Sequence, residues 1–293
     1  KADPKVFFFE VKKSNYEIPG QVTTYHSICE DVSVLVNDAN VSQPIHIVGF
    51  EPLIPENTAR NVHHMQLHSF GGTGTVQRSL ADKEACANGY CGETCKPSAA
   101  LDDGGVVFPW ARGVGSLRVP EEAGFRLFGD GIRSVSLITH YDNPKREKGL
   151  IDNSGVRVYY TKHLREHDIG FMLVGDPNLI ERGETIPKGL SNHTFSCSGI
   201  TQDFVDPEVT IFIRGFHMHS NGARMESRLY RDGEQVRRDW VDFWDFKMAS
   251  GLPLTSTGAG FKVKRGDTFE IDCSYEAKAG AVKFGHGTNE EMC

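Results

Sequence analysis

The sequence lacks any continuous apolar run of the roughly 18 to 20 residues that a membrane-spanning helix requires, so no membrane span is expected. It also lacks a long block of charges of one sign, since 32 Lys and Arg stand against 39 Asp and Glu. Nucleic acid is not an expected partner, because phosphate binding needs a basic patch. No Gly-rich fingerprint of a dinucleotide-binding fold is found in the sequence. The first four residues do not open a signal peptide, and we expect any leader to have been removed.

Glycine and proline divide the chain into short runs rich in Val, Ile, Thr, Phe and Tyr. This pattern is typical of β-sandwiches, so we expect an all-β protein with little helix. A length of 293 residues favours two domains. A polar stretch after Thr161 interrupts the strand pattern, and we place the domain boundary there. The predicted domains are 1–165 and 166–293. Strands are predicted at Ser134–His140, Val156–Thr161, Ile169–Val174 and Val209–Arg214.

Seven cysteines indicate an oxidising compartment. Three of them, Cys86, Cys91 and Cys95, crowd one Gly-containing loop, where disulfides are the favoured interpretation. Zinc is the alternative, but three cysteines without a nearby histidine fit it less well. Glycosylation sequons at Asn40 and Asn192 agree with a secreted glycoprotein, although such triplets also arise by chance. We therefore expect the protein to be secreted or to reside in the lumen of secretory vesicles.

The clearest predicted strand, Val209–Arg214, runs towards two histidines at His217 and His219. If the strand stays regular that far, period-two alternation puts both imidazoles on one face, where they could hold one metal ion. The spacing alone is a weak signal, because histidines so placed are often ordinary surface residues.

The adjacent pair His63 and His64 is a weaker signal still. Neighbours on a regular strand point to opposite faces and can share an ion only at a bulge or a strand end. His140 would supply a third ligand from elsewhere in the chain. His68 could share a face with His64, whereas hydrogen-bonded or solvated roles are expected for the remaining histidines.

These pieces occur together and in order within five short segments, which are Val62-His63-His64-Met65, Trp110-Ala111-Arg112, Thr139-His140-Tyr141-Asp142-Asn143-Pro144, His217-Met218-His219 and Glu290-Glu291-Met292-Cys293. In this combination the sequence resembles the copper type II ascorbate-dependent monooxygenases over roughly residues 22 to 293. Asn153–Thr161 and Tyr230–Gly233 resemble the dopamine β-hydroxylase branch in particular. The joint pattern is highly specific.

The resemblance implies two antiparallel β-sandwich domains, jelly-roll-like, with copper sites that face an interdomain cleft. It implies two copper ions per chain, with ascorbate as electron donor and O2 as co-substrate. The electron-storing copper of the first domain would be held by His63, His64 and His140, and the oxygen-activating copper of the second by His217, His219 and Met292. Imidazole suits both oxidation states of copper, while a thioether favours Cu(I), the state that must meet oxygen. Without the rest of the pattern, Met292 would be a buried structural methionine.

The predicted function is hydroxylation of an aliphatic C–H bond in a small substrate, for which a phenylethylamine-like amine is the nearest analogy. Peptidylglycine α-hydroxylation is an alternative, but Gly215 stands where the peptide-amidating enzyme has a carboxylate-binding arginine, and Arg214 should point the other way. A secreted copper-binding or structural protein of the same fold without turnover is the second alternative. The aromatic stretch 240–246 could line a pocket for an aromatic amine, although core packing is favoured.

The resemblance also pairs Cys273 with Cys293, a bond that would fix the neighbouring Met292. In the rest of the expected scheme, Cys29 bonds to one of the loop cysteines, most favourably Cys86, and Cys91 and Cys95 pair with each other. Cys197 is then expected to remain without a disulfide, because its family partner would lie beyond the position of Cys293.

Overall fold

The computed structural model describes residues 5–36, 43–71, 106–170, 172, 174–176, 178–197, 207–245, 260–285 and 290–293. The chain divides into two compact units, Lys1–Phe171 and Met172–Cys293. The division between the units lies a few residues after the boundary predicted at 165/166. The residues directly after 165 belong to the first unit, because β12 (His167–Asp168) pairs with β8 (Ala123–Leu127) of that unit. Among the described residues, no helix is both long and apolar enough to cross a membrane.

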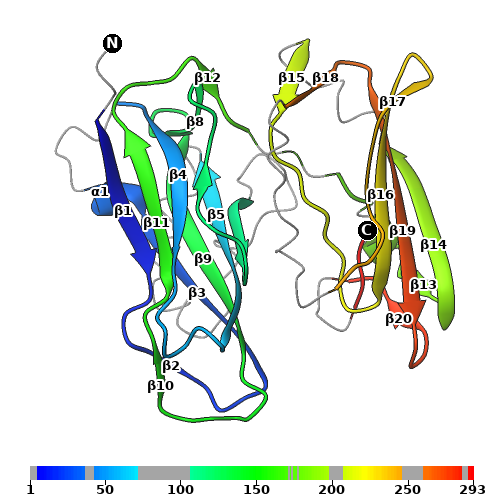
Figure 1. Ribbon diagram of the computed structural model, residues 1–293, viewed down its shortest axis with the longest axis horizontal. Helices are drawn as coiled ribbons and strands as arrows, with labels where there is room; N and C mark the ends of the chain where they lie inside the picture. Colours follow the sequence, from blue (N-terminus) through cyan, green and yellow to red (C-terminus); the bar gives the residue numbers. More distant parts are fainter. Residues whose placement is uncertain are drawn as a thin grey trace. The chain divides into compact units, whose positions relative to one another are not determined.

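The first unit is built almost entirely of strands, as the sequence predicts (Figure 1). One short helix, α1 (Val32–Val36), interrupts them. The other strands are β1 (Val6–Lys12), β2 (Tyr16–Ile18), β3 (Thr23–Asp31), β4 (Ile45–Leu53), β5 (Val62–Gly71), β6 (Val106–Ala111), β7 (Leu117–Arg118), β9 (Ile132–Asp142), β10 (Leu150–Asp152) and β11 (Gly155–Thr161).

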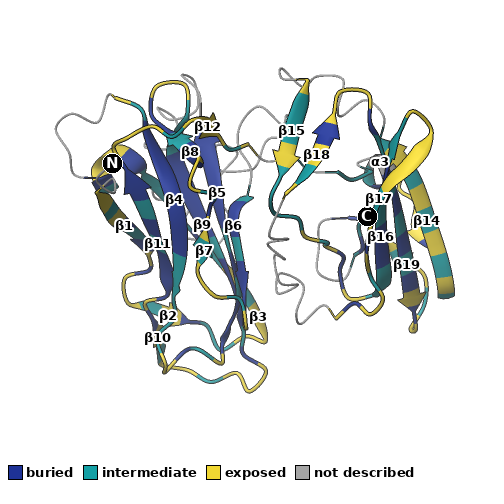
Figure 2. Ribbon diagram, turned by 45° about the horizontal axis from the view of Figure 1, so that its top comes forward, coloured by how far each residue is buried: buried dark blue, intermediate teal, exposed yellow. Residues whose placement is uncertain are grey.

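Strands of the first unit form one large, mostly antiparallel sheet in the order β1-β11-β4-β8-β9-β5-β6, with β3 paired to β9. The sheet curls on itself, and this brings together strands that are not neighbours in it. The ring of Phe50 on β4 stacks against that of Phe108 on β6, with centroids 5.1 Å apart. The curled sheet encloses an apolar core, and Figure 2 shows buried residues along β4, β9 and β5. This core backs the strands that carry the histidines.

The second unit contains smaller sheets and one short helix, α3 (Asn178–Glu181). Its four-stranded sheet has the order β14-β19-β16-β17. An Asp232-Gly233 turn joins β16 to β17, and both residues have positive φ, as the tight turn of such a hairpin requires. The strands are β13 (Thr185–Ile186), β14 (Gly189–Cys197), β15 (Glu208–Ile211), β16 (Gly222–Arg231), β17 (Glu234–Val241), β18 (Phe261–Lys264), β19 (Thr268–Ala277) and β20 (Val282–Lys283).

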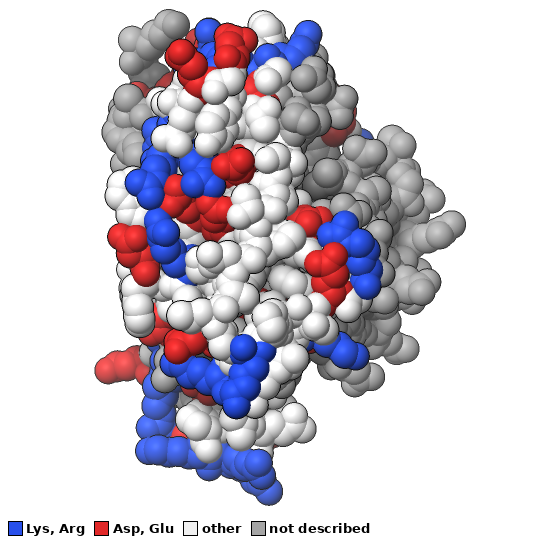
Figure 3. All heavy atoms as spheres, turned by 90° about the vertical axis from the view of Figure 1, so that its right-hand side faces the viewer, with Lys and Arg blue, Asp and Glu red and all other residues white. Residues whose placement is uncertain are grey.

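One face of the four-stranded sheet covers an apolar cluster that includes Met225, Ile271 and Tyr275. The opposite face carries ion pairs, such as Arg238 Nε with Glu226 Oε1 at 2.7 Å. Figure 3 shows basic and acidic side chains interspersed on the face that it draws.

Two of the predicted strands are confirmed and two need correction. Ser134–His140 lies within β9, and Val156–Thr161 lies within β11. The strand from Val209 ends at Ile211, opposite Phe261, the first residue of its antiparallel partner β18, so the alternation does not continue to His219. The strand predicted at Ile169–Val174 is wrong for its described residues, none of which is in a strand. The ladder between β12 and β8 ends before this segment, at the pair Asp168 and Gly124.

Candidate metal centres

A β-bulge brings His63 and His64 to the same place. Across β5 and β9, Val62 lies opposite Tyr141 and His64 lies opposite His140, so His63 is the extra residue in the ladder. A bulge bends the strand and turns its side chains, which removes the opposition of neighbouring residues on a regular strand. This is the exception under which the sequence allows adjacent histidines to act together.

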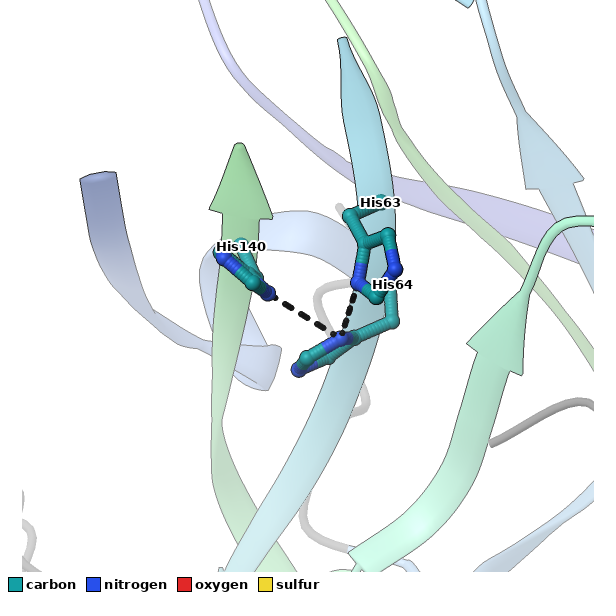
Figure 4. A group of neighbouring side chains, drawn as sticks. All are labelled: His63, His64 and His140. Atoms are coloured by element: carbon teal, nitrogen blue, oxygen red, sulfur yellow. Dashed lines mark hydrogen bonds between the residues drawn. The ribbon is translucent and has the colours of Figure 1, made fainter. Parts of the chain in front are cut away.

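The three histidines converge on one point in the first unit (Figure 4). His64 Nδ1 lies 3.0 Å from His63 Nδ1 and 3.3 Å from His140 Nδ1. One ring nitrogen from each residue fits within a group whose members are all within 4.8 Å of one another. His63 and His140 are buried, and His64 is partly buried.

Hydrogen bonding alone accounts poorly for this arrangement. One imidazole nitrogen carries either one proton or one lone pair, so His64 Nδ1 cannot make two good hydrogen bonds to its two neighbours. A cation that accepts a lone pair from each ring satisfies such a cluster, and three imidazoles are a donor set that suits copper.

The surroundings keep His140 in its neutral, ligating form. Burial, followed by the proximity of His63, lowers the pKa of His140 to about 4, and the Arg112 charge acts in the same direction. Tyr25, which lies opposite His140 on β3, stacks on its ring with centroids 4.5 Å apart. The stacking restricts the orientation of the imidazole.

A buried polar network lies behind His140. The flanking residues Thr139 and Tyr141 are fully buried. Lys13 Nζ donates to Thr139 Oγ1 over 2.5 Å, and Tyr141 Oη donates to Asp152 Oδ2 over 2.6 Å. These bonds anchor both neighbours of the histidine to the interior of the first unit.

His217 and His219 lie close together in the second unit, although their segment is not a strand. Their ring centroids are 5.2 Å apart and the ring planes are nearly perpendicular. His219 is buried, whereas His217 is exposed. The structure therefore brings the predicted pair together by another route than strand alternation.

The main chain of Glu290 selects the tautomer of His219. His219 Nδ1 lies 2.9 Å from the Glu290 carbonyl oxygen, which can only accept a hydrogen bond. Nδ1 therefore carries the proton, and in the neutral ring Nε2 keeps its lone pair for a metal ion. Hydrogen bonds of this kind orient metal-binding histidines.

Met292 belongs to a C-terminal segment that is attached to the sheet of the second unit. The predicted disulfide between Cys273 and Cys293 is confirmed. Tyr275 Oη donates to the Met292 carbonyl oxygen over 3.2 Å. The adjacent Glu291 carboxylate accepts the backbone N–H of His219, so the segment of Met292 lies against that of the histidines.

Trp244 supports the same histidines from the interior. Its Nε1 donates to the His219 carbonyl oxygen over 3.1 Å, and its ring meets that of His217 edge-on at 6.2 Å. Close approach depends on Gly222, since a Cβ there would lie 2.8 Å from Trp244 Cδ1. Core packing, favoured for the aromatic stretch, is right for Trp244, whereas Phe243 is 79% exposed.

Several other predictions find no place in these clusters. His68 is buried beside Gln66 and outside the group of three, and burial lowers its pKa to about 4. The expected loop disulfides, including the partner of Cys29, involve cysteines outside the described residues. Cys197 is a free cysteine, as expected.

Sequence reasoning missed the supporting roles of Tyr25, Trp244 and Glu291. Glu291 stands in a quoted motif and Trp244 in a quoted aromatic stretch, but their hydrogen bonds span 72 and 25 positions. No local pattern reports such contacts. Tyr25 could have been found only by pairing β3 with β9.

Residues 9–148 match the copper type II ascorbate-dependent monooxygenase N-terminal domain, and residues 150–293 match the C-terminal domain. The tyramine beta-hydroxylase of Caenorhabditis briggsae is 29% identical over 94% of this chain. The dopamine beta-hydroxylase of Equus caballus is 31% identical over 97%, and the human DBH-like monooxygenase protein 1 is 27% identical over 98%. The chain spans 45%, 45% and 46% of the respective lengths of these relatives.

The two matches together run through almost the entire chain, in the order of the family's own domains. The converging imidazoles of the first unit agree with a family whose cofactor is copper. The chain belongs to the copper type II ascorbate-dependent monooxygenase family.

Proposed function

We propose that the protein hydroxylates an aliphatic C–H bond of a small, phenylethylamine-like amine, with O2 as co-substrate and ascorbate as electron donor. The observation that carries this proposal is the convergence of His63, His64 and His140, in a chain that matches both domains of the family. The names of two relatives refer to dopamine and tyramine, which are both phenylethylamines.

We assign the electron-transfer copper to the domain predicted at residues 1–165, with His63, His64 and His140 as its ligands. The bulge in β5 and the ladder to β9 preset the three rings. The low pKa of His140 supports the assignment, because it keeps that ring neutral at physiological pH.

We assign the oxygen-activating copper to the domain predicted at residues 166–293, with His217, His219 and Met292 as its ligands. When bound, the two copper ions supply the two electrons from ascorbate, one from each site. The protein holds His219 in the tautomer that leaves Nε2 available, and the thioether of Met292 favours Cu(I).

The environment of Arg214 argues against peptidylglycine α-hydroxylation. The Arg214 guanidinium is paired with the buried Asp239 carboxylate at 2.5 Å, so it does not offer a free cation for a peptide carboxylate. Gly215 has no side chain with which to bind one. A small amine substrate does not require this contact.

We also propose that the protein acts outside the reducing cytosol, either secreted or in the lumen of secretory vesicles. The Cys273–Cys293 disulfide supports this placement, because such bonds persist in oxidising compartments. Asn192, the first residue of a sequon, is exposed on β14 and available for glycosylation.

The test is oxygen consumption by the copper-loaded protein with ascorbate, across phenylethylamines, other small amines and glycine-extended peptides. We expect substrate-dependent uptake and a hydroxylated product with a phenylethylamine. The His217→Ala/His219→Ala variant is the control for uptake by loosely bound copper. Two bound coppers without turnover on any member of the panel would favour the copper-binding protein without catalysis.

A further inference from the structure

The carboxylate of Glu291 is fully buried between the two segments that carry the proposed ligands of the second copper. Its Oε1 accepts the backbone N–H groups of His219 and Met292, the latter over 3.2 Å. Its Oε2 accepts the N–H of Asn221 over 2.9 Å. One side chain thus bonds to both ligand segments.

Apart from the hydrogen bond between His219 Nδ1 and the Glu290 carbonyl oxygen, the other contacts of the C-terminal segment described here run towards the sheet. Cys293 is bonded to Cys273, and Tyr275 Oη donates to the Met292 carbonyl oxygen. The main chain of Glu291 exchanges hydrogen bonds with Lys283 and Gly285, both at 2.9 Å. These contacts attach Met292 to the sheet, but they do not link it to His219.

We propose that Glu291 is the positioning residue that sets the Met292 thioether against the His219 imidazole, so that the carboxylate determines whether sulfur joins the second copper. This inference rests on the proposed function, because it takes His219 and Met292 as ligands of one ion. Glu291 acts through its neighbours and does not touch the metal. This proposal explains why an acidic residue that is not a copper ligand is buried beside the proposed ligands.

The chemistry of three N–H donors explains why a carboxylate is required. A carboxyl group offers two oxygens with several lone-pair positions, so it can accept all three hydrogen bonds. A carboxamide in the same place would turn an NH2 group towards at least one N–H of the same cluster. Glu291→Gln keeps the volume of the side chain and breaks the pattern of acceptors.

The experiment measures copper content and the Cu–S contribution to X-ray absorption in the ascorbate-reduced, copper-loaded protein. The wild type should show a Cu–S contribution that Met292→Ala abolishes. Glu291→Gln should keep two coppers per chain, lose at least about half of the Cu–S contribution, and turn over substrate on the order of tenfold more slowly. The spectroscopic signature separates misplaced sulfur from general destabilisation.

Asp267→Asn is the matched control. Asp267 is also a buried carboxylate of the second unit, and it accepts the Lys264 N–H over 2.8 Å and two hydrogen bonds from Arg231. Its removal should destabilise the unit without changing the Cu–S contribution. Equal loss in Asp267→Asn and Glu291→Gln would overturn the proposal, because the effect would then be unspecific.

The outcomes separate this inference from the proposed function. A full Cu–S contribution in Glu291→Gln, with wild-type turnover, would overturn the role of Glu291 alone. A wild type without any Cu–S contribution would overturn both the ligand assignment of Met292 and the inference. If Glu291→Gln does not fold, Glu291→Asp takes its place, because it shortens the side chain by one methylene and moves the carboxylate away from the N–H groups. A full Cu–S contribution in Glu291→Asp would equally refute the proposal.

Discussion

The two candidate metal sites are built in different ways. In the first unit, His63, His64 and His140 stand on β5 and β9, two strands joined by backbone hydrogen bonds. In the second unit, His217 and His219 stand outside the strands, and side chains hold their segment in place. The first site is therefore set by the register of a sheet, and the second by individual contacts.

This difference has a physical consequence. A ladder of backbone hydrogen bonds keeps its geometry when one side chain changes, and sites on strands are held more accurately than sites on loops. In the second unit, each of Glu291, Glu290 and Trp244 contributes a distinct bond to the His219 segment. We expect the first site to tolerate changes around it and the second to respond to single substitutions.

The largest expected effect is the loss of one copper. His217→Ala/His219→Ala should bind one copper per chain instead of two, because the second site keeps only one of its three proposed ligands. The reciprocal variant, His63→Ala/His140→Ala, should also retain one. Copper is quantified after dialysis against a weak chelator. Two tightly held coppers in the first variant would show that the second ion binds elsewhere.

The second prediction compares the stability of the two units. Cys273→Ser/Cys293→Ser opens a loop with a sequence separation of 20, which should lower the free energy of unfolding of the second unit by about 3 kcal/mol. The first unit should unfold as before. Hydrogen exchange resolved by peptide during urea unfolding reports each unit separately. Equal destabilisation of both units would mean that they unfold as one.

The resemblance to a family predicts the three histidines of the first site, and local rules add the condition under which the adjacent pair can act together. Adjacent histidines on a strand can share an ion only at a bulge or a strand end, and the structure has a bulge at His63. The strand predicted at Ser134–His140 lies within β9, which is buried along most of its length. What sequence could not supply is the register between β5 and β9, which long-range pairing decides.

The second site was less predictable for the same reason. Alternation predicts that the strand from Val209 reaches His219, but β15 pairs only with the short β18 and ends at Ile211. The histidines meet because Trp244, Glu290 and Glu291 bond to their segment from distant positions. Such contacts have no period, so only the resemblance to a family pointed to Met292.

The third prediction tests the thioether itself. Met292→Ala should keep part of its copper at the second site, because two imidazoles remain, but should oxidise substrate at least about tenfold more slowly. This corresponds to a barrier higher by about 1.4 kcal/mol or more, since Cu(I) loses its soft ligand. Met292→His, which supplies a harder ligand, should be impaired in the same way. Near wild-type turnover in Met292→Ala would assign the residue to packing.

The fourth prediction concerns the buried network behind the first site, where the effect per pH unit is small. Burial lowers the pKa of Lys13 from about 10.5 to about 7, although the nearby Asp152 charge opposes the shift. Between these two values the unfolded chain binds more protons than the folded one. The free energy of unfolding of the first unit should therefore rise with pH in this window, by at most about 1.4 kcal/mol per pH unit from this group.

Lys13→Met removes the titrating group and fills a similar volume, so it should flatten that rise. Lys12→Met is the matched control, because Lys12 is the adjacent residue and its side chain is 51% exposed beside Glu10. The measurement is urea unfolding of each variant at several pH values between 7 and 10, with the first unit followed by hydrogen exchange. If Lys13→Met and Lys12→Met have the same slope, Lys13 stays protonated in the folded protein. The buried network behind the first site would then hold the Lys13 charge near that of Asp152 rather than a neutral amine.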